Sequence, residues 1–174
     1  LVNLGAACRR IDIRGIDEEG REIPWDGKTF GELEVRGPWI ISSYYNDERS
    51  KEAFHDGWFK TGDVVTIDPD GFMLIVDRAK DLVKSGGEWI SSIELENIAS
   101  GHPSVLQAAA IGIAHPKWQE RPLLVVTKRE GSSLSAAELL DYMRGRVASW
   151  WLPDAVEFID QMPLTGTGKL WKLK

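Results

Sequence analysis

The chain has 174 residues, of which 43% are apolar and 28% are charged, a balance typical of a globular protein with one full core or two small ones. Its net charge of −6 argues against general binding to nucleic acid or to an anionic membrane, since both depend on a positive protein surface. No apolar run approaches the roughly 20 residues of a membrane-spanning helix. The single cysteine, Cys8, excludes an internal disulfide framework and suits a reducing compartment. We therefore expect a cytoplasmic or organellar protein, and not a secreted one.

Residues 9–76 predict short strands joined by turns. In GELEVRG, at 31–37, Leu33 and Val35 share one face, as in a half-buried strand. The runs WFKTGDVVTI and FMLIV flank Asp68–Gly71, whose sequence DPDG is typical of a hairpin turn. We predict that this part of the chain is a small unit made mostly of β-strands.

After Asp77 the pattern changes to strands that alternate with helices. Ser91 or Ser92 can begin a helix that ends at Gly101, and SAAE at 135–138 is a capping box that starts a second helix. The apolar runs VLQAAAIGI, PLLVVTK and AVEFI have the length of strands. The sequence therefore predicts an α+β fold, in which the later part is a compact module with a small sheet flanked by helices.

The run PLTGTGKLWK, at 163–172, raises the question of a phosphate-binding P-loop. Such a loop needs Gly six positions before its Lys and Ser or Thr directly after it, because its backbone wraps the phosphates while the hydroxyl binds Mg²⁺. Pro163 and Leu170 occupy those two places. We conclude that this run is not a P-loop but a flexible Thr-Gly-Thr-Gly segment that presents one cation, Lys169.

Other polar residues predict no site of their own. The three histidines and one cysteine show no metal-ligand spacing, so we predict no metal site. We interpret His102 and His115, each followed by proline, as turn residues. Glu94 and Glu96 are interpreted as solvated residues at the start of a helix, where negative charge complements the helix dipole.

Four segments of the chain now combine into one pattern. They are WFKTGD at 58–63, DRAKDLVKSGGEWISSIELE at 77–96, HPKWQERP at 115–122 and PLTGTGK at 163–169. Their order and spacing resemble the C-terminal part of the adenylate-forming, AMP-binding superfamily, and within it the acyl-CoA synthetases that act on medium- or long-chain fatty acids. The resemblance implies that 1–77 is the last β-rich subdomain of a large N-terminal domain, and that 78–174 is a mobile C-terminal domain.

The resemblance also implies an activity. Enzymes of this family activate a carboxylic acid with ATP and Mg²⁺ to give an acyl-adenylate, and then replace AMP with the thiol of CoA. The loops that hold the ATP phosphates and Mg²⁺, and the acyl pocket, belong to the larger N-terminal part of such enzymes. We therefore expect this chain to be a fragment with little ligase activity alone; LVNLGAACRR, which lacks an initiator Met and the pattern of a signal peptide, fits that expectation.

By the same resemblance, Asp63 and Arg78 contact the ribose of the nucleotide. A carboxylate at the end of a tight Thr-Gly turn can accept hydrogen bonds from both ribose hydroxyls, and Arg78 supplies donors. The alternative for Asp63 is that it only satisfies its own turn. Lys169 matches the lysine that binds the nucleotide and stabilises the charge that develops during adenylation.

The remaining implied site residues serve the change of conformation between the two steps and the second step itself. Lys80 matches the hinge about which the small domain swings, a place where the family has Asp or Lys. Gly86 and Gly87 match the stretch that lines the tunnel for the pantetheine arm of CoA in the conformation used for the second step. By the same resemblance, Lys84 points toward the reacting centre in that conformation. The alternative for the glycine pair is a simple turn before the strand EWI.

Two other functions remain open at this point. One is an adenylating enzyme that loads a carrier protein or oxidises its product as luciferases do, although HPKWQERP and WWLPD are more similar to fatty acyl-CoA synthetases. The other is a non-catalytic nucleotide-binding or interaction module with the same fold.

Overall fold

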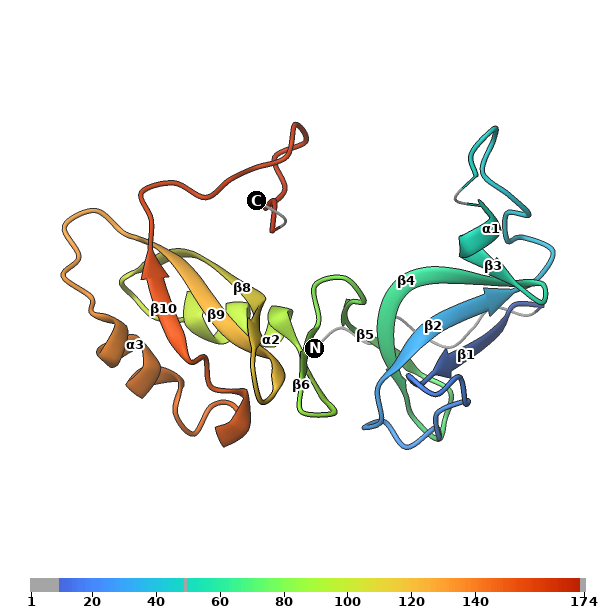
Figure 1. Ribbon diagram of the computed structural model, residues 1–174, viewed down its shortest axis with the longest axis horizontal. Coiled ribbons are helices and arrows are strands. Elements are labelled where there is room, and N and C mark those ends of the chain that lie inside the picture. The colour runs from blue at the N-terminus through green and yellow to red at the C-terminus, as the bar shows by residue number, and fades with distance from the viewer. Residues whose placement is uncertain (1–9, 49, 173–174) are drawn as a thin grey trace. The chain divides into compact units, whose positions relative to one another are not determined.

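The computed structural model describes residues 10–48 and 50–172 and divides the chain into two compact units, 1–80 and 81–174 (Figure 1). Cys8, on which the expectation of a reducing compartment rests, lies outside the described residues. Within the described residues, no helix has the length and apolar character needed to cross a membrane. Strands dominate both units and helices lie in each, so the predicted α+β class is confirmed.

The first unit is built on one antiparallel sheet with the strand order β1-β2-β4-β3, in which β5 also pairs with β4. Its elements are β1 (Asp12–Ile16), β2 (Gly31–Arg36), α1 (Ser50–Ala53), β3 (Phe54–His55), β4 (Trp58–Ile67) and β5 (Met73–Arg78). Leu33 and Val35 lie on one face of β2, as predicted, and pack with Val65 and Ile67 in the core. The predicted hairpin turn joins β4 to β5, where the backbone N–H of Gly71 donates to the carbonyl of Asp68 over 2.9 Å.

A second turn in this unit is organised by Asp26. Its carboxylate accepts the backbone N–H groups of Thr29 and Lys28, each over 2.8 Å, and the hydroxyl of Thr29 over 2.7 Å. These bonds favour the ionised form, the N–H of Thr29 most strongly, and they lower the pKa of Asp26 from its usual 3.8 to about 2.

This shift predicts a pH dependence of stability. Because the pKa of Asp26 is lower in the folded chain than in the unfolded one, its contribution is complete above pH 3.8 and is lost as the pH falls through about 2. The difference in free energy of unfolding between the wild type and Asp26→Asn should therefore shrink over that interval, as measured by urea unfolding at stepped pH. Thr29→Val should move the loss to higher pH, and a difference that stays constant down to pH 2 would contradict the assignment.

The second unit is also built on a single sheet, with the order β10-β9-β6-β7 and β8 on the other edge of β9. Its elements are β6 (Val83–Ser85), β7 (Glu88–Ile90), α2 (Ser92–Ser100), β8 (Val105–His115), β9 (Gln119–Lys128), α3 (Ala136–Met143), a 3-10 turn (Ser149–Trp151) and β10 (Ala155–Phe158). Among the named strands of the described residues, β10 is the one that pairs in parallel, with β9. The long β8–β9 hairpin forms the centre of this unit (Figure 1).

Both helices of the second unit begin and pack as the sequence predicts. Ser91 caps α2, which ends before Gly101, and Ser135 forms a capping box with Glu138 at the start of α3. Side chains of both helices share one core with the sheet: Leu95, Ala99, Leu139 and Met143 from the helices, and Val83, Ile90, Val105, Ala108, Ala110, Leu124 and Val126 from the strands.

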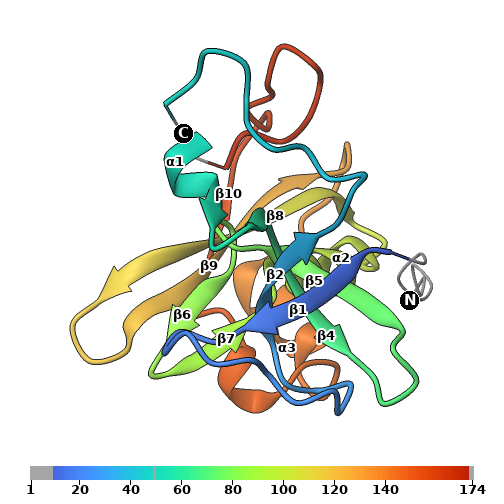
Figure 2. The same cartoon turned by 90° about the vertical axis from the view of Figure 1, so that its right-hand side faces the viewer.

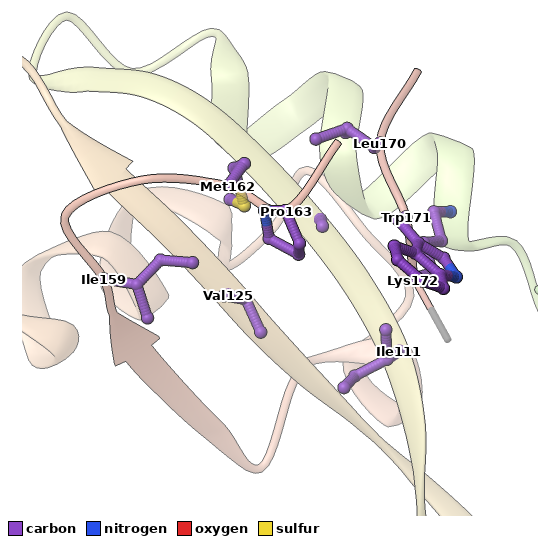
Figure 3. Close-up of a pocket in the computed structure, with 9 residues that line it drawn as sticks. Ile111, Val125, Ile159, Met162, Pro163, Leu170, Trp171 and Lys172 are labelled. Atoms are coloured by element: carbon purple, nitrogen blue, oxygen red, sulfur yellow. The ribbon is translucent and has the colours of Figure 1, made fainter. Parts of the chain in front are cut away.

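The face of this sheet that points away from α2 and α3 is covered by the last part of the described chain. Ala109 and Ile111 of β8 and Val125 of β9 alternate with the core residues and point away from the helices. The segment 159–172 crosses this face, as Figure 3 shows.

Candidate functional site

Asp63 and Arg78 form a cross-strand pair. They are register partners in β4 and β5, and the Arg78 Nη1 donates to Asp63 Oδ1 over 2.8 Å. The Asp63 side chain is 19% exposed and that of Arg78 is 53% exposed, so the pair lies at the surface with its carboxylate partly sheltered. The structure thus brings together the two residues that the sequence assigned to a ribose.

The placement of Asp63 differs from the expected turn. Between the pairs Glu34 with Lys60 and Glu32 with Val64, β4 bulges, so that Thr61 to Asp63 lie opposite a single residue of β2. Gly62 has a φ of +76°, which L-residues adopt at a cost, and the Thr61 hydroxyl bridges the bulge by accepting the N–H of Asp63 over 3.1 Å. Asp63 therefore belongs to a bulged strand, and its carboxylate bonds to Arg78 rather than to a turn of its own.

Lys80 follows this pair at the end of the first unit. The chain divides directly after it, and its side chain is exposed in a turn. One residue earlier, the backbone N–H of Ala79 donates to the carbonyl of Gly62 over 2.9 Å. The backbone hydrogen bond that ties the end of the first unit to the β4 bulge is thus made one residue before Lys80.

Gly86 and Gly87 form the two-residue loop of the β6–β7 hairpin. Their φ values are +63° and +85°, the combination that a type I′ hairpin turn requires and glycine adopts most readily. A side chain on Gly86 would meet the indole of Trp118 at 2.8 Å, whereas one on Gly87 would meet nothing within 4 Å. The turn interpretation of the pair is correct, and Gly87 also leaves an open surface at the loop.

Lys84 lies on the strand that leads into this loop. It faces Trp89 across the hairpin, with its Nζ 5.4 Å from the centre of the indole ring, and its backbone N–H donates to Glu120 Oε2 over 3.0 Å. The same hairpin therefore carries three of the residues that the sequence assigned to the second step.

The β6–β7 hairpin borders a surface hollow of about 400 Å³ that sequence reasoning missed. Its lining consists of Ser85, Gly86, Glu88, Trp118, Arg121, Trp150 and Asp154. Arg121 organises one wall, because its guanidinium donates to the carboxylate of Asp154 over 2.9 Å, to Ser85 Oγ over 3.2 Å and to two backbone carbonyls. The segment HPKWQERP contains Arg121, but its partners Trp150, Leu152 and Asp154 lie 29, 31 and 33 positions away in the chain, so no sequence signal predicted these contacts.

Lys169 lies on a hairpin that is closed by hydrogen bonds. The N–H of Thr165 donates to the carbonyl of Lys169 over 2.7 Å, the Thr165 hydroxyl accepts the N–H of Lys169 over 3.1 Å, and Leu164 bridges to Leu170. Gly168 closes the loop with a φ of +78°. We call residues 163–171 the C-terminal hairpin; it leaves the Lys169 side chain exposed.

The two lysine-bearing hairpins lie apart in the second unit. Figures 1 and 2 show the C-terminal hairpin near the top of this unit and the loop of the β6–β7 hairpin near its bottom, and the two views share that vertical direction. The hairpin that carries Lys84 and the hairpin that carries Lys169 therefore lie at different ends of one compact unit, and the structure does not bring them together.

Comparison with known proteins agrees with these features. Residues 94–169 match the AMP-binding enzyme C-terminal domain. The chain is 54% identical to 3-methylmercaptopropionyl-CoA ligase of Ruegeria lacuscaerulensis over 99% of its own length and 32% of that protein. It is 48% identical to medium-chain-fatty-acid–CoA ligase of Ectopseudomonas oleovorans, over 93% and 30% of the two chains. The chain thus spans about a third of the length of these relatives.

A solved structure extends the likeness to the fold. The o-succinylbenzoate coenzyme A synthetase of Bacillus subtilis, in complex with ATP and magnesium ion, superposes with a TM-score of 0.85 at 31% identity, over 99% of this chain and 35% of that one. In sequence and in fold, this chain corresponds to the C-terminal portion of AMP-binding acyl-CoA ligases.

Proposed function

We propose that this chain is part of an ATP-dependent acyl-CoA ligase, which converts a carboxylic acid to an acyl-adenylate and then to a CoA thioester. One observation carries the proposal: the second unit presents two separate hairpins, each with a lysine, on different faces. A two-step reaction in one centre needs two sets of groups in turn, and a unit that rotates between the steps can supply one face for each. In this proposal 1–77 completes the large domain and 78–174 is the part that moves.

The first unit would bind the nucleotide through Asp63 and Arg78. A ribose offers two adjacent hydroxyls, and a carboxylate can accept hydrogen bonds from both. The ion pair with Arg78 orients the Asp63 carboxylate and leaves its remaining lone pairs for the ligand. A contact to the ribose would persist in both steps, because AMP stays bound until the thiol displaces it.

Lys169 would serve adenylation. In this step a carboxylate oxygen of the acid forms a bond to the α-phosphorus of ATP, and pyrophosphate leaves with the electrons of the broken P–O bond. Negative charge gathers on the α-phosphate oxygens as five-fold coordination develops, so an ammonium beside them stabilises the transition state more than the ground state. Bound Mg²⁺ would neutralise the phosphate charge of ATP; the described residues of this chain contain no cluster of acidic, His or Cys side chains suited to a metal.

The β6–β7 hairpin would serve thioester formation. Here the CoA sulfur attacks the carbonyl carbon of the acyl-adenylate, its proton is lost, and AMP leaves. The open surface at Gly87 admits an extended chain such as pantetheine close to the backbone, and Lys84 stands on the strand that leads there. The adjoining hollow of about 400 Å³, with Trp118 and Trp150 in its wall, offers apolar faces beside the same loop.

Lys80 would be the hinge for the change between these two arrangements. Hinges need a few exposed residues that absorb large φ and ψ changes, and these residues need not be glycine. Lys80 is exposed, lies in a turn and stands where the chain divides into its two units.

The acid itself would be chosen by parts of the protein outside this chain. The names of the relatives offer two candidates: a medium- or long-chain fatty acid, and 3-methylmercaptopropionate. We propose the fatty acid from the likeness of HPKWQERP and WWLPD to fatty acyl-CoA synthetases. A panel of 3-methylmercaptopropionate and fatty acids of increasing chain length, assayed with the full-length protein for CoA thioester, distinguishes the two. Acyl-adenylate without thioester would favour a carrier-protein or luciferase-like enzyme instead.

The nucleotide assignment predicts the effect of Asp63→Ala in the full-length protein. Loss of the carboxylate removes charge-assisted hydrogen bonds, so the KM for ATP should rise by roughly 10- to 10²-fold, a range set by the value of such bonds. The measurement is ATP dependence in both pyrophosphate exchange and ligation. Asp12→Ala is the matched control, because Asp12 forms an equivalent cross-strand pair with Arg36 on β1 and β2. Equal effects of the two substitutions, or an unchanged KM, would reject the role of Asp63.

A further inference from the structure

Lys172 directly follows the C-terminal hairpin, and its side chain makes buried polar contacts. Its Nζ lies 2.6 Å from Glu96 Oε1 and donates to Ser92 Oγ over 2.7 Å. The side chains of Lys172 and Glu96 are only 14% and 16% exposed, and Ser92 is fully buried. A charge pair this sheltered is worth more than a surface one, and removing one partner leaves the other charge without compensation.

Glu96 connects this anchor to the sheet. Its Oε1 also accepts the backbone N–H of Ala110 in β8, over 2.9 Å. The interpretation of Glu96 as a solvated helix residue is therefore wrong: α2 turns its carboxylate inward, where it joins the helix, the strand and the end of the C-terminal hairpin. We call Lys172, Glu96 and Ser92 the Lys172 anchor.

Packing alone does not fix the C-terminal hairpin. A mainly apolar hollow of about 180 Å³ lies between the segment and the sheet, lined by Ile111, Val125, Met162, Leu170 and Trp171 among others (Figure 3). A hollow of this size lacks the close contacts that hold a filled core in one arrangement. Figure 3 also shows Trp171 and Lys172 beside α2, at one end of the hollow.

The C-terminal hairpin links Lys172 to Lys169, so that the place of one affects the place of the other. Its two arms are joined by the bond from the Trp171 N–H to the Pro163 carbonyl, over 2.9 Å, and by the Leu164 and Leu170 bridge. Lys169 stands three residues before the anchor on the same arm. We propose that Lys172 is a positioning residue, which holds the C-terminal hairpin against α2 and β8 so that Lys169 is presented in one geometry for adenylation.

This inference rests on the proposed function for the role of Lys169. A displacement of about 1 Å in a group that stabilises a transition state can cost on the order of 10²-fold in rate. Lys172→Met in the full-length protein keeps the length and apolar stem of the side chain but loses the ammonium. We expect it to slow single-turnover formation of acyl-adenylate by roughly 10- to 10²-fold. Formation of thioester from supplied acyl-adenylate should change less than two-fold.

Three further variants make the test specific. Lys172→Arg keeps the charge and should restore most of the rate, whereas Glu96→Gln keeps an acceptor for Ala110 but loses the charge and should be slowed less than Lys172→Met. In the Lys169→Ala background, Lys172→Met should have no further effect, because a residue that acts through Lys169 has nothing left to position. Deuterium exchange at residues 163–172 should rise in Lys172→Met and return in Lys172→Arg.

Asp141→Asn is the control, since it breaks an exposed ion pair between Asp141 of α3 and Arg144, which directly follows that helix in the same unit. If Lys172→Met slows both half-reactions alike, or adds its full effect to that of Lys169→Ala, the anchor is only structural and the inference is overturned. Normal adenylation by Lys172→Met, with Lys169→Ala strongly impaired, would overturn the anchor and leave the proposed function intact. Normal adenylation by Lys169→Ala would instead reject the proposed role of Lys169 itself.

Discussion

Lys169→Ala in the full-length protein is expected to slow formation of acyl-adenylate by about 10²–10³-fold, which is what a single group that stabilises a developing oxyanion contributes. The ammonium is a compact charge on a long stem, and no neutral side chain replaces its attraction for the α-phosphate oxygens. Single-turnover kinetics with ATP and the acid measure this step directly. The same variant should form thioester from supplied acyl-adenylate at nearly the normal rate.

The selectivity between the two steps is the sharper part of this prediction. The C-terminal hairpin and the β6–β7 hairpin lie apart in the second unit, and the proposed function assigns each of them to one step. Lys51→Ala, which removes another exposed lysine, should change neither step. Equal losses in both assays for Lys169→Ala would show that the two faces do not alternate.

Local sequence signals predicted the elements of the fold well. The capping box at Ser135 and the DPDG turn each act within a few residues, and the structure confirms both. The face that Leu33 presents to the core was also visible, because alternation along a strand needs no knowledge of its partner. The sequence therefore predicts those features, such as caps, turns and strand faces, that depend on residues close together in the chain.

Contacts across long distances in the chain could not be predicted in this way. Glu96 has the pattern of a solvated helix residue, and only the path of the last residues over the sheet brings Lys172 to it from 76 positions away. Asp63 was placed at a turn because Thr-Gly suggests one, whereas pairing with β2 and β5 on both sides turns the same residues into a bulge. For the candidate site, the sequence motifs predict which residues to consider, whereas the fold determines which of them are in contact, as Asp63 and Arg78 are.

Gly87→Phe is expected to show the opposite bias to Lys169→Ala. A large side chain at this position would fill the open surface of the β6–β7 loop, where the proposed function requires the pantetheine arm to pass. Formation of thioester from supplied acyl-adenylate should fall by roughly 10²-fold, as for a misplaced reactant, while formation of acyl-adenylate from ATP and the acid should stay close to normal. Lys84→Ala, on the same hairpin, should lower the rate of the same step, formation of the thioester.

Backbone strain is the rival explanation, and the chain offers a matched control for it. Gly87 has a φ of +85°, and a side chain there costs about 1–2 kcal/mol in backbone energy whatever its function. Gly145 has a φ of +73° and, like Gly87, would meet nothing within 4 Å if a Cβ were added. Gly145→Phe therefore introduces the same ring with similar strain, in the same unit, after α3. If Gly145→Phe slows thioester formation as much as Gly87→Phe does, the effect is one of stability. If only Gly87→Phe slows this step, the loop itself approaches CoA, and the β6–β7 hairpin lies on the face that the second step uses.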